Sequence, residues 1–282
     1  MLEAYATWLE RDVLAATGPE AATFLQGQLS QDVLALRDGD SAWSWVLGPT
    51  GKVDALVRVI RVSYEEWVLD TDSGWGDSVL ARLNRFKLRT KVSLSALPWK
   101  VLGLRYGVAE IGSPGEAIEV TAQWPRLLRG VDRLGSNPSV PDGWVVVPPE
   151  DYEARRVAAG LPKMGAELTE KTIPAETGLV ELTVSFTKGC YTGQELVARI
   201  DSRGGNVPRR LRGLILPGPV AVGTDLVASA PDGRVVGVVT SAARGADGGW
   251  VGLAYVRRGV DPPLIVRAGD DGPEVEVREL AS

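Results

Sequence analysis

The C-terminal third of the chain constrains the fold most, because every signal for a helix ends there. From residue 210 onward, short runs rich in β-branched residues alternate with Gly, Pro and Asp-Gly turns. This pattern is typical of antiparallel strands. The expected strands span residues 211–216, 225–228, 235–241, 250–255, 264–267 and 275–278. Such strands, with no helix between them, predict a small antiparallel barrel or sandwich and a domain boundary near residues 204–210.

The first hundred residues mix helical and strand patterns. Gly18-Pro19-Glu20 opens an expected helix, since proline fits the first helical turn. The apolar face of that helix contains Ala22, Leu25, Leu29 and Val33, which recur at helical spacing. Strands are expected over residues 43–47, 53–62, 67–69 and 92–97, and a helix over residues 79–88. Residues 43–97 therefore predict a small α+β unit of a ferredoxin-like kind.

The middle of the chain carries weaker signals. Residues 107–142 are rich in Gly, Pro and Ser, and we interpret them as strands joined by loops. Residues 144–147 predict a buried strand. A helix is expected from Pro148 to about Ala159, ended by Gly160. Residues 161–187 are expected to be mostly irregular.

Length and charge limit the class of protein. A chain of 282 residues suggests two domains, with one or three also possible. No run of about 18 apolar residues occurs, so no membrane span is expected. The start of the chain lacks a basic-then-apolar leader, which favours a cytoplasmic location. The net charge of −5 argues against a general nucleic-acid binder, since such proteins are usually basic overall.

The chain has no histidine and a single cysteine. Ser-His-Asp and Cys-His catalytic groups are therefore impossible, as are histidine-ligated zinc and iron sites. One thiol cannot hold a four-thiolate iron–sulfur cluster within one chain. We expect no stably bound metal, and any chemistry must come from carboxylates, Lys, Arg, Tyr, the lone thiol or a bound cofactor.

The lone cysteine lies in a segment with several features of a reactive site. Thr192 and Glu195 are spaced as a capping box, so Cys190 is expected just before a helix N-terminus, two residues from Lys188. Both features favour a thiolate. Gly189 and Gly193 permit tight bends or close approach to a ligand. The alternative is a small buried hydrophobe, and the residues alone leave both interpretations open.

A cluster of arginines lies after this segment. Its members are Arg199, Arg203, Arg209, Arg210 and Arg212, opposed only by Asp201. Arginine forks suit carboxylates and phosphates, so the cluster could bind an anion. A solvated, charged linker between two domains explains the same residues.

The segment Lys188-Gly189-Cys190-Tyr191-Thr192-Gly193-Gln194-Glu195 resembles the K-G-C-[FY]-x-G-Q-E motif of YgfZ-type folate-binding proteins, which are relatives of the glycine-cleavage T-protein. Residues 159–165 and 172–179 are similar to the part of the family that precedes the motif. Residues 197–200 and 209–211 match the part that comes after it, and residues 24–33 resemble the family's first helix. The similar parts cover about half of the chain in the expected order.

The resemblance implies an α+β fold arranged as a three-part ring. A central folate-binding domain would contain residues 1–42 and 120–205. A ferredoxin-like unit would contain residues 43–119, and a C-terminal antiparallel β-barrel would contain residues 206–282.

The resemblance also implies a function. The chain would bind tetrahydrofolate or a one-carbon derivative and assist the assembly or maintenance of iron–sulfur clusters in client enzymes, including some that modify tRNA. Cys190 and Lys188 would be its catalytic residues. The expected folate contacts are Gly189, Tyr191, Gly193, Gln194, Glu195, Arg199 and Arg209. The implied partners are folate and iron–sulfur client or assembly proteins, and a monomer is expected.

Two departures from the T-proteins limit the alternative, a folate-dependent aminomethyl or methyl transferase. T-proteins carry Lys-x-Asp/Asn-Phe-type residues where this chain has residues 188–191. They also carry a Glu in an Arg-x-Glu-Ala-Gly stretch, where this chain has Ala158. Losing that carboxylate removes a bidentate partner for a pterin ring. A third possibility is a pure binding module that uses the arginine cluster to hold a partner protein or RNA.

Overall fold

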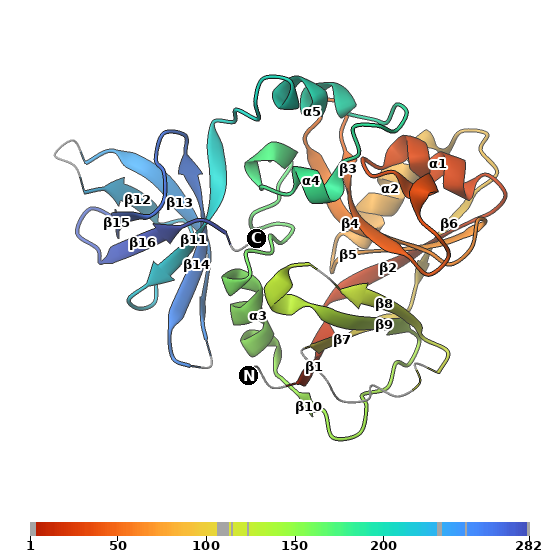
Figure 1. Ribbon diagram of the computed structural model, residues 1–282, viewed down its shortest axis with the longest axis horizontal. Helices are drawn as coiled ribbons and strands as arrows, with labels where there is room; N and C mark the ends of the chain where they lie inside the picture. The colour runs from red at the N-terminus through yellow and green to blue at the C-terminus, as the bar shows by residue number, and fades with distance from the viewer. Residues whose placement is uncertain are drawn as a thin grey trace.

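The protein contains two five-stranded sheets and a closed barrel. The computed structural model describes residues 4–105, 113, 115–122, 124–229, 233–245 and 247–280. Figure 1 shows the barrel on the left and the two sheets on the right, with helix α3 (Pro149–Ala158) between them. This arrangement confirms the α+β class and the expected barrel. No helix in these described ranges has both the length and the apolar character needed to cross a membrane.

The first sheet has the strand order β3-β4-β5-β2-β6. Its strands are β2 (Arg11–Thr17), β3 (Ser41–Leu47), β4 (Val53–Arg61), β5 (Glu66–Asp72) and β6 (Ser93–Leu97). Its helices are α1 (Ala21–Gln28) and α2 (Gly76–Lys87), and a short 3-10 helix, η1, spans Val33–Ala35. The predicted strands and helices of residues 18–97 are confirmed, although α1 ends earlier than its apolar spacing suggested. The four apolar residues of that spacing are all buried.

This sheet is ferredoxin-like in chain order when β3 is set aside, but it begins earlier than predicted. Strand β2 lies between β5 and β6, antiparallel to both. It buries Val13 on one face of the sheet and Leu14 and Ala16 on the other. Strand pairing therefore crosses the boundary expected at residue 42, because β2 is a central strand whose two buried faces hide the usual alternation. The division into three domains otherwise stays a prediction.

The second sheet has the strand order β10-β1-β7-β9-β8. Its strands are β1 (Tyr5–Leu9), β7 (Lys100–Arg105), β8 (Ile118–Ala122), β9 (Gly130–Gly135) and β10 (Val145–Val146), and the 3-10 helix η2 spans Arg126–Leu128. The strands expected within 107–142 are β8 and β9, while residues 106–112, 114 and 123 lie outside the described residues. The buried strand expected at 144–147 was wrong. Val145 is 67% exposed, because β10 is an edge strand that pairs only with β1.

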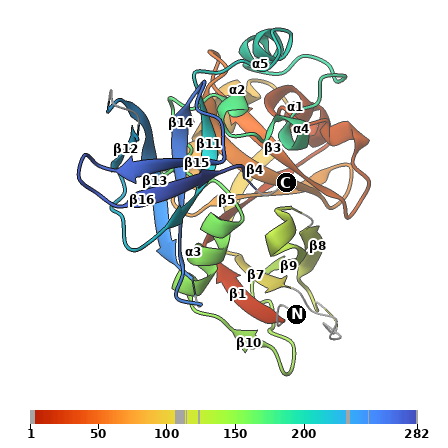
Figure 2. The same ribbon diagram turned by 60° about the vertical axis from the view of Figure 1, so that its left-hand side comes forward.

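The first sheet is covered on both faces. Helices α1 and α2 pack on one face through a large core that includes Leu25, Leu83 and Trp45. The opposite face packs on the second sheet through Val13, Ile60, Val68 and residues of β7, β8 and β9. Figure 2 shows α1 and α2 above the first sheet and the second sheet below it. The face of the first sheet that points toward the second sheet can therefore line the space between them.

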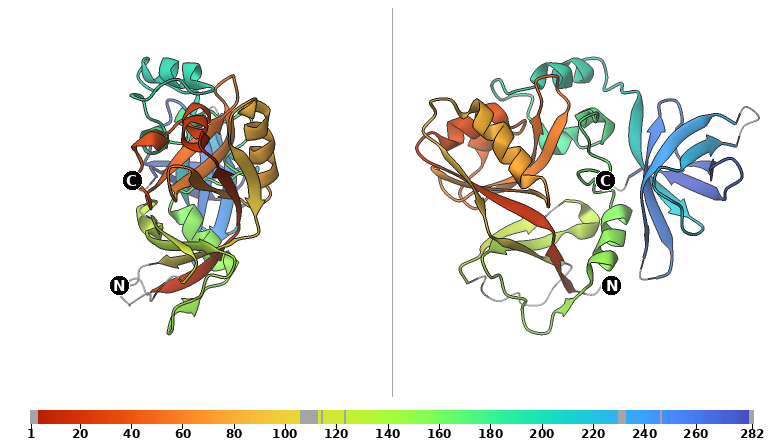
Figure 3. Two further views of the ribbon diagram at one scale, coloured as in Figure 1. Left: turned by 90° about the vertical axis from the view of Figure 1, so that its right-hand side faces the viewer. Right: turned by 180° about the vertical axis from the view of Figure 1, so that it is seen from behind.

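The barrel closes in the order β11-β14-β13-β12-β15-β16. Its strands are β11 (Arg209–Leu216), β12 (Asp225–Ala228), β13 (Val235–Arg244), β14 (Trp250–Arg257), β15 (Leu264–Ala268) and β16 (Glu274–Arg278). All six predicted strands are confirmed. Figure 3 shows that the barrel stands beside the sheets, with α3 along the contact between them. The contact is apolar at Val157, Leu211 and Leu253.

A buried carboxylate holds the barrel to the rest of the chain. Glu167 is fully buried and accepts hydrogen bonds from Ser241 Oγ of the barrel at 2.6 Å and from Arg156 Nη1 of α3 at 3.3 Å. Tyr255 Oη donates to the carbonyl of the same residue at 3.0 Å. Residues 161–187 are mostly irregular, as expected, apart from the 3-10 helix η3 (Pro174–Glu176) and the short helix α4 (Val180–Thr183).

Candidate functional site

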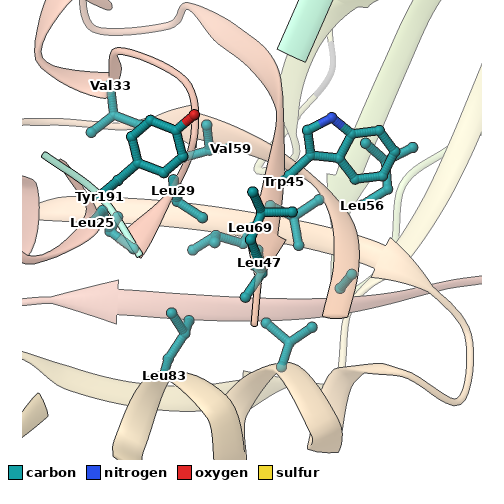
Figure 4. Packing of buried hydrophobic residues seen from close by; sticks show 14 of the residues in the cluster. Leu25, Leu29, Val33, Trp45, Leu47, Leu56, Val59, Leu69, Leu83 and Tyr191 are labelled. Atoms are coloured by element: carbon teal, nitrogen blue, oxygen red, sulfur yellow. The ribbon is translucent and has the colours of Figure 1, made fainter. Parts of the chain in front are cut away.

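The predicted motif forms a loop that leads into helix α5 (Gln194–Asp201). Cys190 is exposed, so it is not the buried hydrophobe that composition alone allowed. Tyr191, the next residue, is only 9% exposed and belongs to the core of the first sheet. Figure 4 shows its ring beside Leu25 and Val33. The loop thus buries an aromatic anchor and presents the adjacent thiol to solvent.

Lys188 fixes this loop to the end of α1. Its Nζ donates hydrogen bonds to the carbonyls of Gln26 and Leu29 at 2.6 Å each and to the carbonyl of Gln31 at 2.9 Å. The ammonium also lies 5.1 Å from the ring centroid of Tyr191. Burial lowers the pKa of Lys188 to about 8, and Asp32 opposes this shift. An ammonium has three donors, so these carbonyls use all of them. Lys188 is placed to hold the loop rather than to reach a ligand.

The expected capping box between Thr192 and Glu195 was wrong. Gly193 is the N-cap of α5, with φ of 83°, and no described side chain caps the helix. Gln194 instead accepts a hydrogen bond from the backbone N–H of Tyr191 through Oε1 at 3.1 Å. A Cβ at Gly193 would lie 2.6 Å from the carbonyl oxygen of Gly48. The close approach to the 48–51 turn therefore requires glycine and moves the helix start past Thr192.

The remaining predicted contacts do not gather in one pocket. Gly189 is exposed, as are Glu195 and Arg199 on α5. Arg209 forms an ion pair with Glu176 at 3.2 Å and lies 4.1 Å from the ring centroid of Tyr255. Arg209 therefore joins the barrel to η3. The protein also has a large cavity between the two sheets, and none of these predicted site residues is among the described residues that line it.

That cavity has a volume of about 650 Å³ and lies between the two sheets, beside α3. Three indoles lie in its wall: Trp8 of β1, Trp43 of β3 and Trp124. Trp43 and Trp124 meet edge to face, with ring centroids 5.9 Å apart. Tyr152, Glu153 and Arg156 of α3 close one side. The size lies within the usual range for a small-molecule site. Residue spacing did not identify these tryptophans, because they come from distant parts of the chain.

Alternating charges from both sheets form one wall of the cavity. Arg11 pairs with Asp70 at 2.6 Å and with Asp72 at 2.7 Å. Arg58 of the first sheet pairs with Asp70 at 2.8 Å and with Asp132 of the second. Each of these carboxylates is thus bound by an arginine of the first sheet. Because the arginines and carboxylates of this wall pair with one another, their charges largely cancel.

The wall also fixes the ionisation of its members. Burial alone would raise the pKa of Asp132, but the guanidinium groups of Arg105, at 2.7 Å, and Arg58 outweigh it and hold the pKa below its usual value. Desolvation raises the pKa of the Tyr152 hydroxyl, so it stays a neutral hydrogen-bonding group. By contrast, Lys163 lines the cavity without an ion pair within 4 Å to any described residue, although its charge helps to lower the pKa of Glu153. Among the described cations of the lining, it is the one that no carboxylate contacts directly.

Ala158 stands where the T-proteins carry the Glu that helps to hold the pterin ring, and it lies outside the cavity. Ala158 is exposed and does not line this cavity, although α3 contributes Tyr152, Glu153 and Arg156 to it. No three His, Cys, Asp or Glu side chains come together as metal ligands in the described parts of the chain.

One segment connects the motif loop with the cavity. The carbonyl of Gln31 accepts from Lys188, while its side-chain Nε2 donates to the carbonyl of Leu182 at 3.0 Å. Leu182 lines the cavity. Ser30 Oγ accepts from the backbone N–H of Trp45 at 2.8 Å, on the strand that carries Trp43. The two places are separate but share residues 26–31.

The fold defines the class of this protein. No family model matches the chain. Its structure is similar to the crystal structure of the glycine cleavage system aminomethyltransferase T from Bartonella henselae, with a TM-score of 0.83 over 99% of this chain and 86% of that chain. The sequence identity is 20%, so the likeness shows a shared fold, that of the glycine-cleavage T-protein.

Sequence comparison narrows this class to a family. The chain is 30% identical to the mouse mitochondrial iron-sulfur cluster assembly factor IBA57, over 92% of this chain and 79% of that protein. It is 26% identical to the tRNA-modifying protein YgfZ of Klebsiella pneumoniae, over 94% and 88% of the two chains. The chain belongs to the family of YgfZ and IBA57, so the family expected from the sequence is confirmed.

Proposed function

We propose that this protein binds tetrahydrofolate, or a one-carbon derivative of it, in the cavity between the two sheets. The observation that carries the proposal is the set of three indoles around about 650 Å³, because flat pterin and aminobenzoate rings need apolar, aromatic walls. Lys163 offers a charge to the ligand's glutamate carboxylate. The arginines Arg11 and Arg58 are already paired with Asp70, so they shape the wall rather than bind the ligand.

We further propose that the protein is an accessory factor for iron–sulfur proteins, acting through Cys190. Its relatives include a protein named as an iron–sulfur cluster assembly factor and one named as tRNA-modifying. An exposed thiol, held at a fixed place by Lys188 and Tyr191, suits a transient contact with a cluster-bearing client. Folate in the cavity and the thiol loop would communicate through residues 26–31.

A tetrahydrofolate titration tests the first proposal. Binding to the wild type, monitored by quenching of tryptophan fluorescence, should saturate. Trp124→Leu should weaken it about threefold to tenfold, the effect of one lost aromatic contact. Trp250→Leu, on the barrel outside the cavity, is the matched control and should bind as the wild type does. Unchanged affinity in a folded Trp124→Leu protein would contradict the assignment of the cavity.

The role of the thiol is tested in cells that depend on this protein. Cys190→Ser should lower the activity of iron–sulfur enzymes, including those that modify tRNA. Thr187→Ala, an exposed neighbour in the same loop, is the control and should leave that activity unchanged. Full activity with Cys190→Ser would remove the motif thiol from the function.

A further inference from the structure

A second hollow lies next to α5, away from the large cavity. Its volume is about 240 Å³, and its apolar lining comes from Val197 and Ile200 of α5, Ile173 and Pro174 at η3, and Val180 of α4. The apolar part of the described lining is aliphatic and contains no aromatic ring. The hollow is open to solvent on α5, the helix that begins within the Cys190 motif. Such a hollow accepts one or two aliphatic side chains.

Exposed arginines lie on the barrel side of this hollow. Arg210, which lines it, donates to the carbonyl of Gly205 at 2.8 Å. Strand register places Arg257 directly opposite Arg209, which pairs with Glu176 of η3. The backbone N–H of Arg258 donates to the carbonyl of Pro208 at 2.9 Å, so this residue lies at the same end of the barrel.

These cations form no ion pair in the part of the chain that the structure describes. No described carboxylate lies within 4 Å of the exposed arginines Arg210, Arg257 and Arg258 at this end of the barrel. Glu181 and Asp201 line the hollow as well, on α4 and at the end of α5. Positive charge therefore dominates the barrel side of the hollow in a protein whose net charge is −5.

We infer that this hollow and the three exposed arginines at the adjoining end of the barrel, Arg210, Arg257 and Arg258, form a docking face for an acidic segment of a partner protein. An aliphatic side chain of the partner enters the hollow, and flanking carboxylates bind the arginines on the barrel side. Single-stranded RNA fits less well, because such ligands are usually held by stacking on aromatic side chains, and the described lining of the hollow has none.

The docking face lies on the helix that carries the end of the Cys190 motif. Its role therefore follows from the function proposed above for the thiol. Helix α5 is about 12 Å long; its N-terminal turn belongs to the motif, and Val197 and Ile200 further along it line the hollow. A partner seated there would extend along α5 toward the loop that exposes the Cys190 thiol. The docking face would thus select acidic partners and orient them toward the thiol.

Binding of short fluorescein-labelled peptides tests this inference by anisotropy. A peptide in which acidic residues flank one leucine should bind the wild type. Changing the leucine to serine, or the acidic residues to glutamine, should each weaken binding about tenfold, since anchor and charge both contribute. Equal binding of all three peptides, or no binding of the first, would overturn the inference without requiring any protein variant.

Protein variants locate the face. The double substitution Arg210→Glu with Arg257→Glu, and separately Ile200→Ser, should each weaken binding of the leucine peptide about tenfold. Arg244→Glu is the control, because Arg244 is exposed at the end of β13, across from Trp250 and so at the opposite end of the barrel. Retained binding in the folded double variant would refute the face. Oligouridylate that binds more tightly than the peptide, and is lost in the same double variant, would assign the face to RNA instead.

Peptide binding at the docking face can be tested independently of tetrahydrofolate binding in the large cavity. The double variant should bind tetrahydrofolate as the wild type does, because neither arginine lines the large cavity. A wild type that binds the peptide and fails to bind tetrahydrofolate would contradict the proposed ligand alone.

Discussion

Replacing Lys188 with methionine tests whether this lysine anchors the motif loop. Methionine keeps the approximate length of the side chain and removes the donors of three hydrogen bonds, at 2.6, 2.6 and 2.9 Å. A buried carbonyl that loses its partner costs about 1–3 kcal/mol. Water reaches part of this half-buried site, so we take about 1 kcal/mol for each carbonyl. Relief of the desolvated ammonium offsets part of this sum, which leaves a destabilisation of about 2 kcal/mol.

Urea unfolding of Lys188→Met and wild type measures this difference, with Lys171→Met, an exposed lysine, as the control. A change in unfolding free energy below about 0.5 kcal/mol would refute the anchoring role.

Two buried groups and the motif give three further predictions. Glu167→Gln should destabilise the contact between barrel and sheets by about 2–3 kcal/mol, because Arg156 loses a buried carboxylate; urea unfolding against the exposed control Glu170→Gln checks this. Burial raises the pKa of Tyr191 to about 12, so an unfolded tyrosine ionises first and folding stability falls from about pH 10 to 12. Tyr191→Phe should lack that part of the decline in unfolding measurements across this range, and an identical decline would contradict the burial. Purified protein given tetrahydrofolate and an aminomethyl donor should form no 5,10-methylenetetrahydrofolate, and its formation would favour the transferase alternative.

The sequence predicted the barrel well because each of its strands is local. A short β-branched run between two turns can be recognised as a strand without knowing which strands it pairs with. All six barrel strands, β11 to β16, were predicted in this way. Helix α3 was equally clear, with a proline start and Gly160 at its end. Strands β1 and β2 were missed. Strand β2 lies in the centre of a sheet covered on both faces, so its sequence does not alternate, and no turn signal separates it clearly from β1.

The motif and the cavity differ in how far they can be predicted. The motif is one continuous segment, so its residues could be recognised together, but the role of Lys188 depends on carbonyls that precede it by more than a hundred residues. The cavity takes Arg11, Arg58 and Asp132 from three separate strands. Charged residues on strands usually indicate a solvated face, and only the pairing between sheets reveals that these are buried.

Residues 26–31 explain how two separate places can belong to one function. The carbonyls of Gln26, Leu29 and Gln31 hold Lys188, and Gln31 also holds Leu182 at the cavity wall. A ligand that shifts the wall at Leu182 or at Trp43 would therefore act on the same backbone that fixes the thiol loop. Coupling requires that this segment has two arrangements with different affinities for the ligand. The resemblance to the family's first helix falls on these residues, which is consistent with a connecting role and not only with a core helix.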